Sequence, residues 1–163
     1  MIGIGKVIHV GHETFHNGRG LVESITRNKN RGLKVFSGFD CDAVVDWPVC
    51  DWFDVLMNQY RESKFVMSFR PPQDAAISWV RMIASQPGRH TNPRNYSEFE
   101  SYAKGHIDRV FEAFSGTTER LLFLDMRDDD ETKWKLLCQF VGAAVPADPF
   151  PSEFSHREWQ ANA

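Results

Sequence analysis

The stretch KFVMSFRPPQDAAISWV, residues 64–80, contains a complete transition from strand to helix. Its first half belongs to an apolar run, residues 63–70, that has the length of a buried strand and stops at Arg70 before two prolines. Its second half opens a helical pattern over residues 74–84, with Asp74 in a position suited to an N-cap. A buried strand that leads directly into a helix is typical of a parallel sheet covered by helices.

The same alternation of strand and helix continues in both directions along the chain. Short apolar runs predict further strands, and amphipathic stretches predict further helices. The tail from about residue 145 is rich in proline and irregular. We therefore expect a single domain over residues 1–163, an α/β fold of three layers (α/β/α) with a central parallel sheet. The expected strands cover residues 6–10, 33–38, 42–46, 63–70 and 120–126, and the expected helices cover residues 20–26, 49–60, 74–84, 98–114 and 129–142, with a loop at residues 87–97.

Composition and charge argue against several classes of protein. A hydrophobic fraction of 42% in a chain of 163 residues indicates a globular domain with its own core. The net charge of −3 gives no electrostatic reason to expect a nucleic-acid partner, and the basic stretch at residues 26–34 fits a solvated turn at least as well as an anion site. The 3 cysteines are far apart and lack C-x-x-C spacing, so we expect a reducing, cytoplasmic location. Neither an export signal nor a membrane span is indicated.

Polar side chains gather in the loops that follow the expected strands. In a parallel sheet, ligands bind at the carboxyl ends of the strands, where loops enter helix N-termini. Three such loops, residues 11–20, 46–48 and 70–78, carry suitable groups. In the third loop, the spacing of Arg70 and Ser78 suits the binding of one phosphate by a guanidinium and a hydroxyl. A surface ion pair for Arg70 and a polar helix contact for Ser78 are the alternatives.

The first of these loops contains His-Glu-Thr-Phe-His, residues 12–16, which has the H-E-x-x-H spacing of a zinc peptidase. That motif needs a helix, because a helix places both imidazoles on one face to reach a single metal ion. Here an apolar run enters the motif through Gly11, and residues 17–20 leave it as a cluster of turn formers. We therefore expect no metal site. Metal analysis of the purified protein would distinguish a zinc site from a loop of another kind.

Three separated segments resemble one protein family. Residues 39–65 resemble a Y-D-A-x-x-D-x-P segment, residues 64–80 resemble a strand followed by R-N/D-P-x-D-x-x-x-S and a helix, and residues 120–151 resemble a closing strand, a tryptophan-bearing helix and a P-x-x-P-F-P tail. These segments occur in the same order in the P-loop-like sulfotransferases, and the likeness is closest to their bacterial and algal branch. The resemblance implies a P-loop-NTPase-like sulfotransferase fold.

The second of these segments is the part of the family that holds a nucleotide phosphate. Arg70, Asp74 and Ser78 match the family pattern at its spacing, and Pro71 stands in place of the usual Asn or Asp. The resemblance implies that Arg70 and Ser78 bind the 3′-phosphate of 3′-phosphoadenosine 5′-phosphosulfate (PAPS) and of its product, adenosine 3′,5′-bisphosphate (PAP).

The resemblance also gives the first loop a role other than zinc binding. In the family, a loop of the form G-x-P-K/R-S/T-G-T-T/S-S follows the first strand, and its backbone N–H groups bind the 5′-phosphosulfate. GHETFHNGRGL, residues 11–21, occupies that place but lacks most of the pattern, and Glu13 would repel a dianion. A cradle of N–H groups is still expected, and Arg19 is a candidate for the catalytic cation, with His16 or His12 as alternatives. The candidate cofactor-binding residues of this loop are Gly11, His12, Thr14, His16, Asn17 and Gly18.

Two side chains are candidates for the catalytic base that removes the proton of the acceptor. Asp46 ends an expected strand and matches the acidic position of the family's D-x-P segment. Its alternative role is to cap the helix that begins near Val49. His106 matches a histidine on a family helix, and its alternative role is that of a core residue on an apolar stripe.

The sequence thus predicts a sulfotransferase that moves a sulfuryl group from PAPS to a hydroxyl or amine of a small acceptor. The alternative is a non-catalytic relative that binds a nucleotide, another phosphate or a partner after loss of the phosphosulfate loop. Because 163 residues is short for the family, we expect acceptor-binding elements to be reduced or to come from a second subunit of a homodimer. The acceptor itself depends on variable loops such as residues 87–97.

Overall fold

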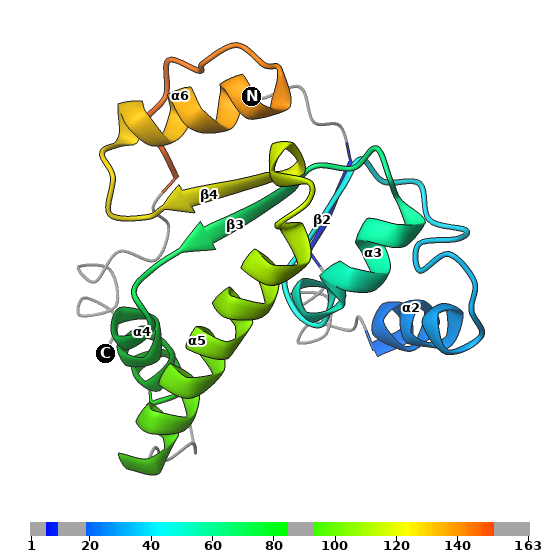
Figure 1. Ribbon diagram of the computed structural model, residues 1–163, viewed down its shortest axis with the longest axis horizontal. Coiled ribbons are helices and arrows are strands. Elements are labelled where there is room, and N and C mark those ends of the chain that lie inside the picture. Colours follow the sequence, from blue (N-terminus) through cyan, green and yellow to red (C-terminus); the bar gives the residue numbers. More distant parts are fainter. Residues whose placement is uncertain (1–5, 10–18, 85–92, 152–163) are drawn as a thin grey trace. The chain divides into compact units, whose positions relative to one another are not determined.

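The computed structural model describes residues 6–9, 19–84 and 93–151 (Figure 1). The chain forms two compact units, residues 1–63 and residues 64–163, and each has its own parallel pair of strands. The expected mixture of helices with parallel strands is confirmed. A three-layer arrangement of the whole chain around one central sheet stays a prediction, and so does a single domain over residues 1–163.

The first unit begins as a strand, a helix and a parallel strand. Strand β1 (Val7–His9) pairs in parallel with β2 (Ala43–Val45), and helix α2 (Arg19–Asn30) lies between them along the chain. After β2 come a 3-10 turn, η1 (Val49–Trp52), and helix α3 (Phe53–Gln59). The helix expected over residues 49–60 is thus confirmed as η1 followed by α3, and it contributes two core residues. The buried apolar side chains of the unit are Ile25, Val35, Val49 and Leu56.

The strand predicted at residues 33–38 is wrong, because this segment is a series of turns. Its backbone groups bond to side chains of the two helices instead of to a neighbouring strand. The Gln59 side chain accepts a hydrogen bond from Val35 N at 2.8 Å, and the Tyr60 hydroxyl accepts one from the next backbone N–H at 2.9 Å. The Asn28 amide donates to Val35 O at 3.0 Å. Val35 is fully buried, so its backbone N–H and C=O groups need hydrogen-bond partners within the protein. Side chains supply these partners here in place of a neighbouring strand.

The second unit contains the strand-to-helix transition that the sequence predicts. Strand β3 (Phe65–Phe69) pairs in parallel with β4 (Leu121–Asp125), and helices α4 (Pro72–Ala84) and α5 (Pro93–Phe114) lie between them along the chain. A short 3-10 turn, η2 (Thr118–Arg120), precedes β4, and helix α6 (Asp130–Val141) follows it. Figure 1 shows α5 and α6 on either side of the β3–β4 pair.

Aromatic contacts join α5 to one face of this pair. Phe65 packs against Phe114 with ring centroids 5.0 Å apart, and Phe123 stacks on Phe111 at 4.2 Å. Leu124 points to the opposite face of β4 and is buried. The prediction of a wholly buried strand at residues 63–70 is wrong in detail, since β3 alternates half-buried with exposed residues and Val66 is 45% exposed. Side chains on one face of β3 pack beneath α5, whereas alternate residues on its other face are exposed.

Helices α4 and α5 both begin earlier than the sequence predicts. Helix α4 begins at Pro72, so Asp74 lies in its first turn and is not its N-cap. Helix α5 begins at Pro93, which makes residues 93–97 of the expected loop helical. The reason is the same for both helices. Proline suits the first helical position, because the N–H group there would have no acceptor within the helix. The remainder of that loop, residues 87–92, lies outside the described residues.

Helix α6 lies within the expected range, residues 129–142, and the residues at the two ends of that range cap it. Asp129 is the N-cap, and its carboxylate accepts hydrogen bonds from the backbone N–H and the hydroxyl of Thr132, both at 2.8 Å. Gly142 ends the helix in the left-handed conformation with φ of 77°, which costs least for glycine. The tail that follows is irregular through residue 151, as expected. Trp134 Nε1 holds this tail by donating to Asp148 O at 2.8 Å.

Replacement of the α6 cap, Asp129→Ala, is expected to lower the free energy of unfolding by about 1 kcal/mol at neutral pH. Hydrogen bonds from Thr132 lower the pKa of Asp129 in the folded protein. The stabilisation is therefore present above the pKa of the unfolded chain and is lost as the pH falls through the folded pKa. Urea unfolding at pH 7 and near pH 2 measures this difference. An equal loss for Asp128→Ala, which removes a neighbouring carboxylate outside the helix, would contradict the cap assignment.

Candidate functional site

The second unit brings together two of the residues that the sequence predicts to bind phosphate. Arg70 directly follows β3 and is exposed, and Ser78 lies on the second turn of α4 and is half-buried. Arg70 Nη1 lies 3.5 Å from Ser78 Oγ. That distance is at the long limit of a hydrogen bond, so the bond holds the two groups only weakly. Their polar atoms converge on a region where one anion can accept bonds from both.

The start of α4 adds to the positive potential of this region. Backbone N–H groups in the first turn of a helix lack intrahelical acceptors and carry partial positive charge. Helix α4 is 13 residues long and begins two residues after Arg70, so its N-terminal turn and the guanidinium belong to one short segment. Asp74 lies in the same turn and partly offsets this charge. The arrangement suits binding of a phosphate oxyanion by a guanidinium, a hydroxyl and a helix N-terminus.

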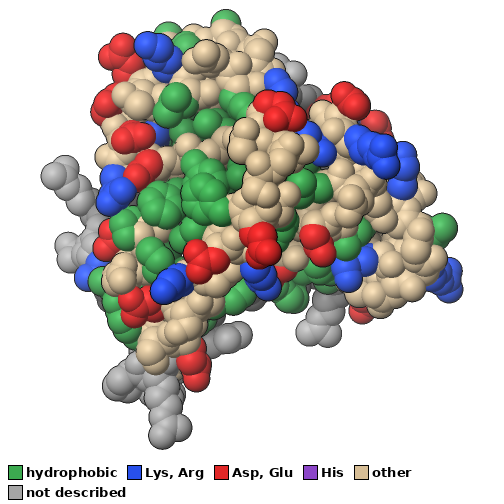
Figure 2. Space-filling model, viewed as in Figure 1, with side chains coloured by type: hydrophobic (Ala, Val, Ile, Leu, Met, Phe, Trp, Pro, Cys, Tyr) green, Lys and Arg blue, Asp and Glu red, His purple; other side chains and the backbone are tan. Residues whose placement is uncertain are grey.

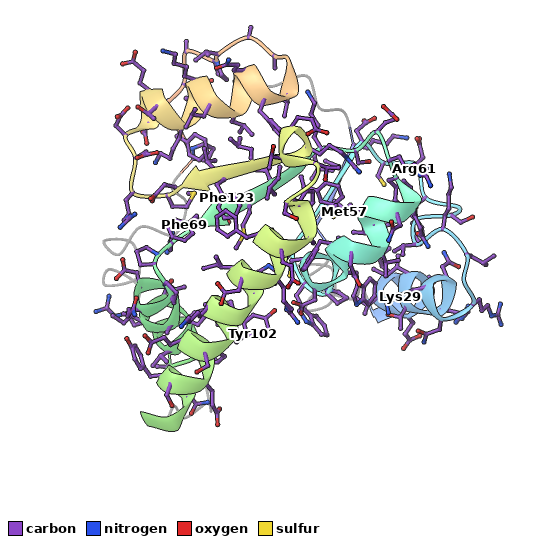
Figure 3. The ribbon with its side chains drawn as sticks, in the orientation of Figure 1. Lys29, Met57, Arg61, Phe69, Tyr102 and Phe123 are labelled. Atoms are coloured by element: carbon purple, nitrogen blue, oxygen red, sulfur yellow. The ribbon has the colours of Figure 1, made fainter. Side chains whose placement is uncertain are left out.

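An ion pair that the sequence analysis did not single out lies at the carboxyl end of the neighbouring strand. Arg127 donates to both oxygens of Asp125, with Nη2 2.5 Å from Oδ2 and Nε 3.0 Å from Oδ1. These bonds lower the pKa of Asp125 to about 2. The Arg127 guanidinium also lies 5.9 Å from the ring centroid of Phe69, the residue before Arg70 (Figure 3 labels Phe69). The signal in the sequence was an arginine that directly follows an expected strand end.

Asp46 lies in the first unit, directly after β2, and its side chain is exposed. Its backbone has a positive φ of 78°, a conformation that Asp and Asn adopt more readily than most residues. Its Oδ1 accepts a hydrogen bond from Trp47 N at 2.7 Å. The residue that precedes η1 is Pro48, and η1 has no side-chain cap bond. The backbone oxygen of Asp46 accepts a hydrogen bond from Cys50 N in η1 at 3.2 Å, so the catalytic role and the capping role of Asp46 both stay predictions.

The thiol of Cys50, four residues after Asp46, is kept in its neutral form by its surroundings. Partial desolvation, together with the carboxylates of Asp51 and Asp46, raises the pKa of Cys50 to about 11. A thiol with so high a pKa is a poor nucleophile at neutral pH. Cys50 is therefore not a candidate catalytic residue.

His106, the second candidate base, lies on α5 and is half-buried. Its ring stacks on Tyr102 with centroids 6.0 Å apart and an angle of 10° between the ring planes. Its Nδ1 lies 3.5 Å from Arg109 Nη2. The apolar face expected here is only partly buried, since Phe111 is 56% exposed. Both the catalytic and the structural interpretation of His106 are compatible with these contacts.

The candidate phosphosulfate loop lies outside the described residues, with its predicted binding residues Gly11, His12, Thr14, His16, Asn17 and Gly18. The flanking elements agree with the sequence analysis, because β1 ends at His9 and α2 begins at Arg19. The backbone of Arg19 is thus at the first position of a helix, whereas its side chain is not described. Within residues 6–9, 19–84 and 93–151, no group of at least 3 His, Cys, Asp or Glu residues is arranged to hold a metal ion.

The sequence matches the family model of the sulfotransferase domain over residues 1–90 and 74–159. The chain therefore belongs to the sulfotransferase domain family, whose chemistry is the transfer of a sulfuryl group. This membership supports an enzyme of the transferase class, and it does not favour the non-catalytic alternative. A search of curated proteins finds no significant match to the chain. In the described part of the chain, no helix has both the length and the apolar character needed to cross a membrane.

Proposed function

We propose that the protein transfers a sulfuryl group from PAPS to a hydroxyl or amine of a small acceptor. The observation that carries this proposal is the convergence of Arg70 and Ser78 at the start of α4, 3.5 Å apart. A 3′-phosphate distinguishes PAPS from most other adenine nucleotides, and these two groups suit its recognition. The family membership supports the same chemistry independently of this geometry.

The residues divide into those that bind the donor and those that move a proton. Arg70 and Ser78 bind the 3′-phosphate, and backbone N–H groups of residues 11–18 bind the 5′-phosphosulfate with Arg19 as the cation. PAPS, when bound, supplies the sulfuryl group that is transferred. Asp46 accepts the proton that the acceptor loses, and His106 is the second candidate for this task. The proposed reaction needs no metal.

The proposal includes the organisation of the whole protein. It has residues 1–163 as a single three-layer α/β/α domain with a central parallel sheet. It also includes a homodimer in which the second subunit supplies acceptor-binding groups. A cytoplasmic location and the absence of nucleic-acid or membrane partners belong to the same proposal.

Calorimetric titration of the purified protein with PAP and with adenosine 5′-phosphate tests the donor assignment. We expect PAP to bind at least roughly tenfold more tightly, because hydrogen bonds between charged groups contribute about 1.5–3 kcal/mol. Incubation with labelled PAPS and a panel of small hydroxyl and amine acceptors then tests transfer. Equal affinity for the two nucleotides would contradict a 3′-phosphate site. Tight PAP binding without turnover would support the non-catalytic alternative.

A further inference from the structure

The exits of β3 and β4 place a second arginine, Arg127, at the edge of the strand pair where Arg70 lies. The two strands run parallel with Phe69 opposite Asp125, and Met126 N continues the pairing by donating to Phe69 O at 2.9 Å. Arg70 and Arg127 each follow this last hydrogen bond by one residue along their own strand. Because the strands are parallel, both arginines leave the sheet at its carboxyl edge.

Side-chain contacts place the guanidinium of Arg127 over this edge. It lies 5.9 Å from the ring centroid of Phe69, immediately before Arg70 in the chain. The hydrogen bonds to Asp125 are the main cause that raises the pKa of Arg127, and the carboxylates of Asp74, on the first turn of α4, and Asp128 raise it too. Arg127 is thus linked both to the strand that leads to Arg70 and to the helix that carries Ser78.

Stability alone does not account for the Asp125–Arg127 pair. The side chain of Arg127 is 59% exposed and that of Asp125 is 27% exposed. Solvent screening limits what ion pairs in such exposed positions contribute to stability. The pair does fix the direction of the guanidinium, because the bonds to Asp125 engage its Nε and Nη2. The bonds to Asp125 do not involve Nη1. A guanidinium that is already held in a fixed orientation loses less entropy when it binds an oxyanion.

The surface around the pair is suited to a charged group beside an apolar one. Figure 2 shows acidic and basic side chains next to hydrophobic surface in the region where Figure 1 draws the carboxyl end of β4. Phe69 and Phe123 form part of the aromatic packing on this face, with ring centroids 6.3 Å apart (Figure 3). The carboxylates of Asp125 and Asp74 limit the net positive charge here. An anion would therefore be selected by the geometry of the arginines and not by general attraction.

We propose that Arg127 is a second residue that recognises the 3′-phosphate, with Asp125 as the positioning residue that orients its guanidinium. This inference rests on the proposed function, because it assumes that Arg70 and Ser78 bind that phosphate. It extends the site from one strand exit to two, and it assigns a binding role to a residue outside the R-x-P-x-D-x-x-x-S pattern. The 3′-phosphate would then be bound by two guanidinium groups from neighbouring strands.

The test compares Arg127→Ala with Arg120→Ala by calorimetric titration with PAP and with adenosine 5′-phosphate. Arg120 is a matched control, because its guanidinium lies 5.5 Å from the ring centroid of Phe65, near the opposite end of β3. Both variants lose one positive charge and one arginine–phenylalanine contact. We expect Arg127→Ala to weaken PAP about tenfold while adenosine 5′-phosphate changes less than about twofold, the effect of one charged hydrogen bond. Arg120→Ala is expected to change neither.

A second variant keeps the test decisive if Arg127→Ala does not fold. Arg127→Lys retains the charge but lacks the planar fork, so we expect PAP to bind about threefold more weakly at an unchanged melting temperature. PAP binding at parental affinity by Arg127→Lys, and by Arg127→Ala where that variant folds, together with a loss in Arg70→Ala, would overturn the role of Arg127 and leave the proposed function standing. A parent protein that binds PAP no better than adenosine 5′-phosphate would overturn both.

Discussion

Arg70→Ala is expected to weaken PAP binding by about 1.5–3 kcal/mol, roughly 10- to 150-fold, and to leave adenosine 5′-phosphate almost unaffected. The reason is that the Arg70 guanidinium and the Ser78 hydroxyl converge at the start of α4, 3.5 Å apart, where a 3′-phosphate can accept bonds from both. Their mutual bond is long, so little interaction within the protein is lost when the arginine is removed. Isothermal titration calorimetry with both nucleotides measures the effect.

Arg81→Ala is a suitable control for this prediction. Arg81 lies in the last turn of the same helix, α4, so its removal changes the net charge equally but leaves the N-terminal turn intact. We expect it to bind both nucleotides like the parent protein. If Arg70→Ala weakened the binding of PAP and of adenosine 5′-phosphate by the same factor, Arg70 would not recognise the 3′-phosphate. A loss of PAP affinity in Arg81→Ala of the same size would point to general electrostatic attraction instead.

The local parts of the fold follow from the sequence because their causes are local. The β3 strand, the α4 helix and both caps of α6 depend on apolar periodicity and on single residues such as Asp129 and Gly142. The Arg70–Ser78 contact spans only 8 residues, so a strand exit followed by a helix is enough to predict it. These are the features for which a pattern in one segment contains the physical reason.

The segment at residues 33–38 shows why other parts could not be predicted. Its apolar composition favours a strand, but the groups that bind its backbone come from elsewhere in the chain. Gln59, which accepts from Val35 N, is 24 residues away. No pattern within the segment reveals that side chains of α3 will replace a neighbouring strand. Tertiary hydrogen bonds therefore outweighed local propensity at this place.

The proposed role of Arg127 escaped the sequence analysis for a related reason. Arg70 and Arg127 leave neighbouring strands at the same edge because β3 and β4 pair in one particular register, with Phe69 opposite Asp125. The sequence predicts both strands but does not fix which residues lie opposite each other. A site built from two strand exits becomes visible only when that register is known.

Asp46→Asn is expected to lower the rate of sulfuryl transfer by about 10²- to 10⁴-fold while the fold and the affinity for PAP stay close to those of the parent. An amide lacks the carboxylate that would take the acceptor's proton. It is otherwise a close replacement, because Asn tolerates the positive φ of 78° at this position and its side-chain oxygen can still accept from Trp47 N. Transfer from labelled PAPS, with calorimetric titration of PAP and thermal melts, separates these quantities.

Two further variants distinguish a base from a residue that only supports the turn. Asp46→Ala removes the carboxylate and also places an unfavourable residue in the left-handed region, at a cost of about 1–2 kcal/mol. If Asp46 is the base, Asn and Ala should reduce transfer equally although only Ala lowers the melting temperature substantially. Asp51→Asn removes a neighbouring carboxylate that, like Asp46, raises the pKa of Cys50, and it should retain parental activity. Parental transfer rates in Asp46→Asn would place the base elsewhere, and His106→Ala would then be the next variant to measure, because that imidazole is the remaining candidate.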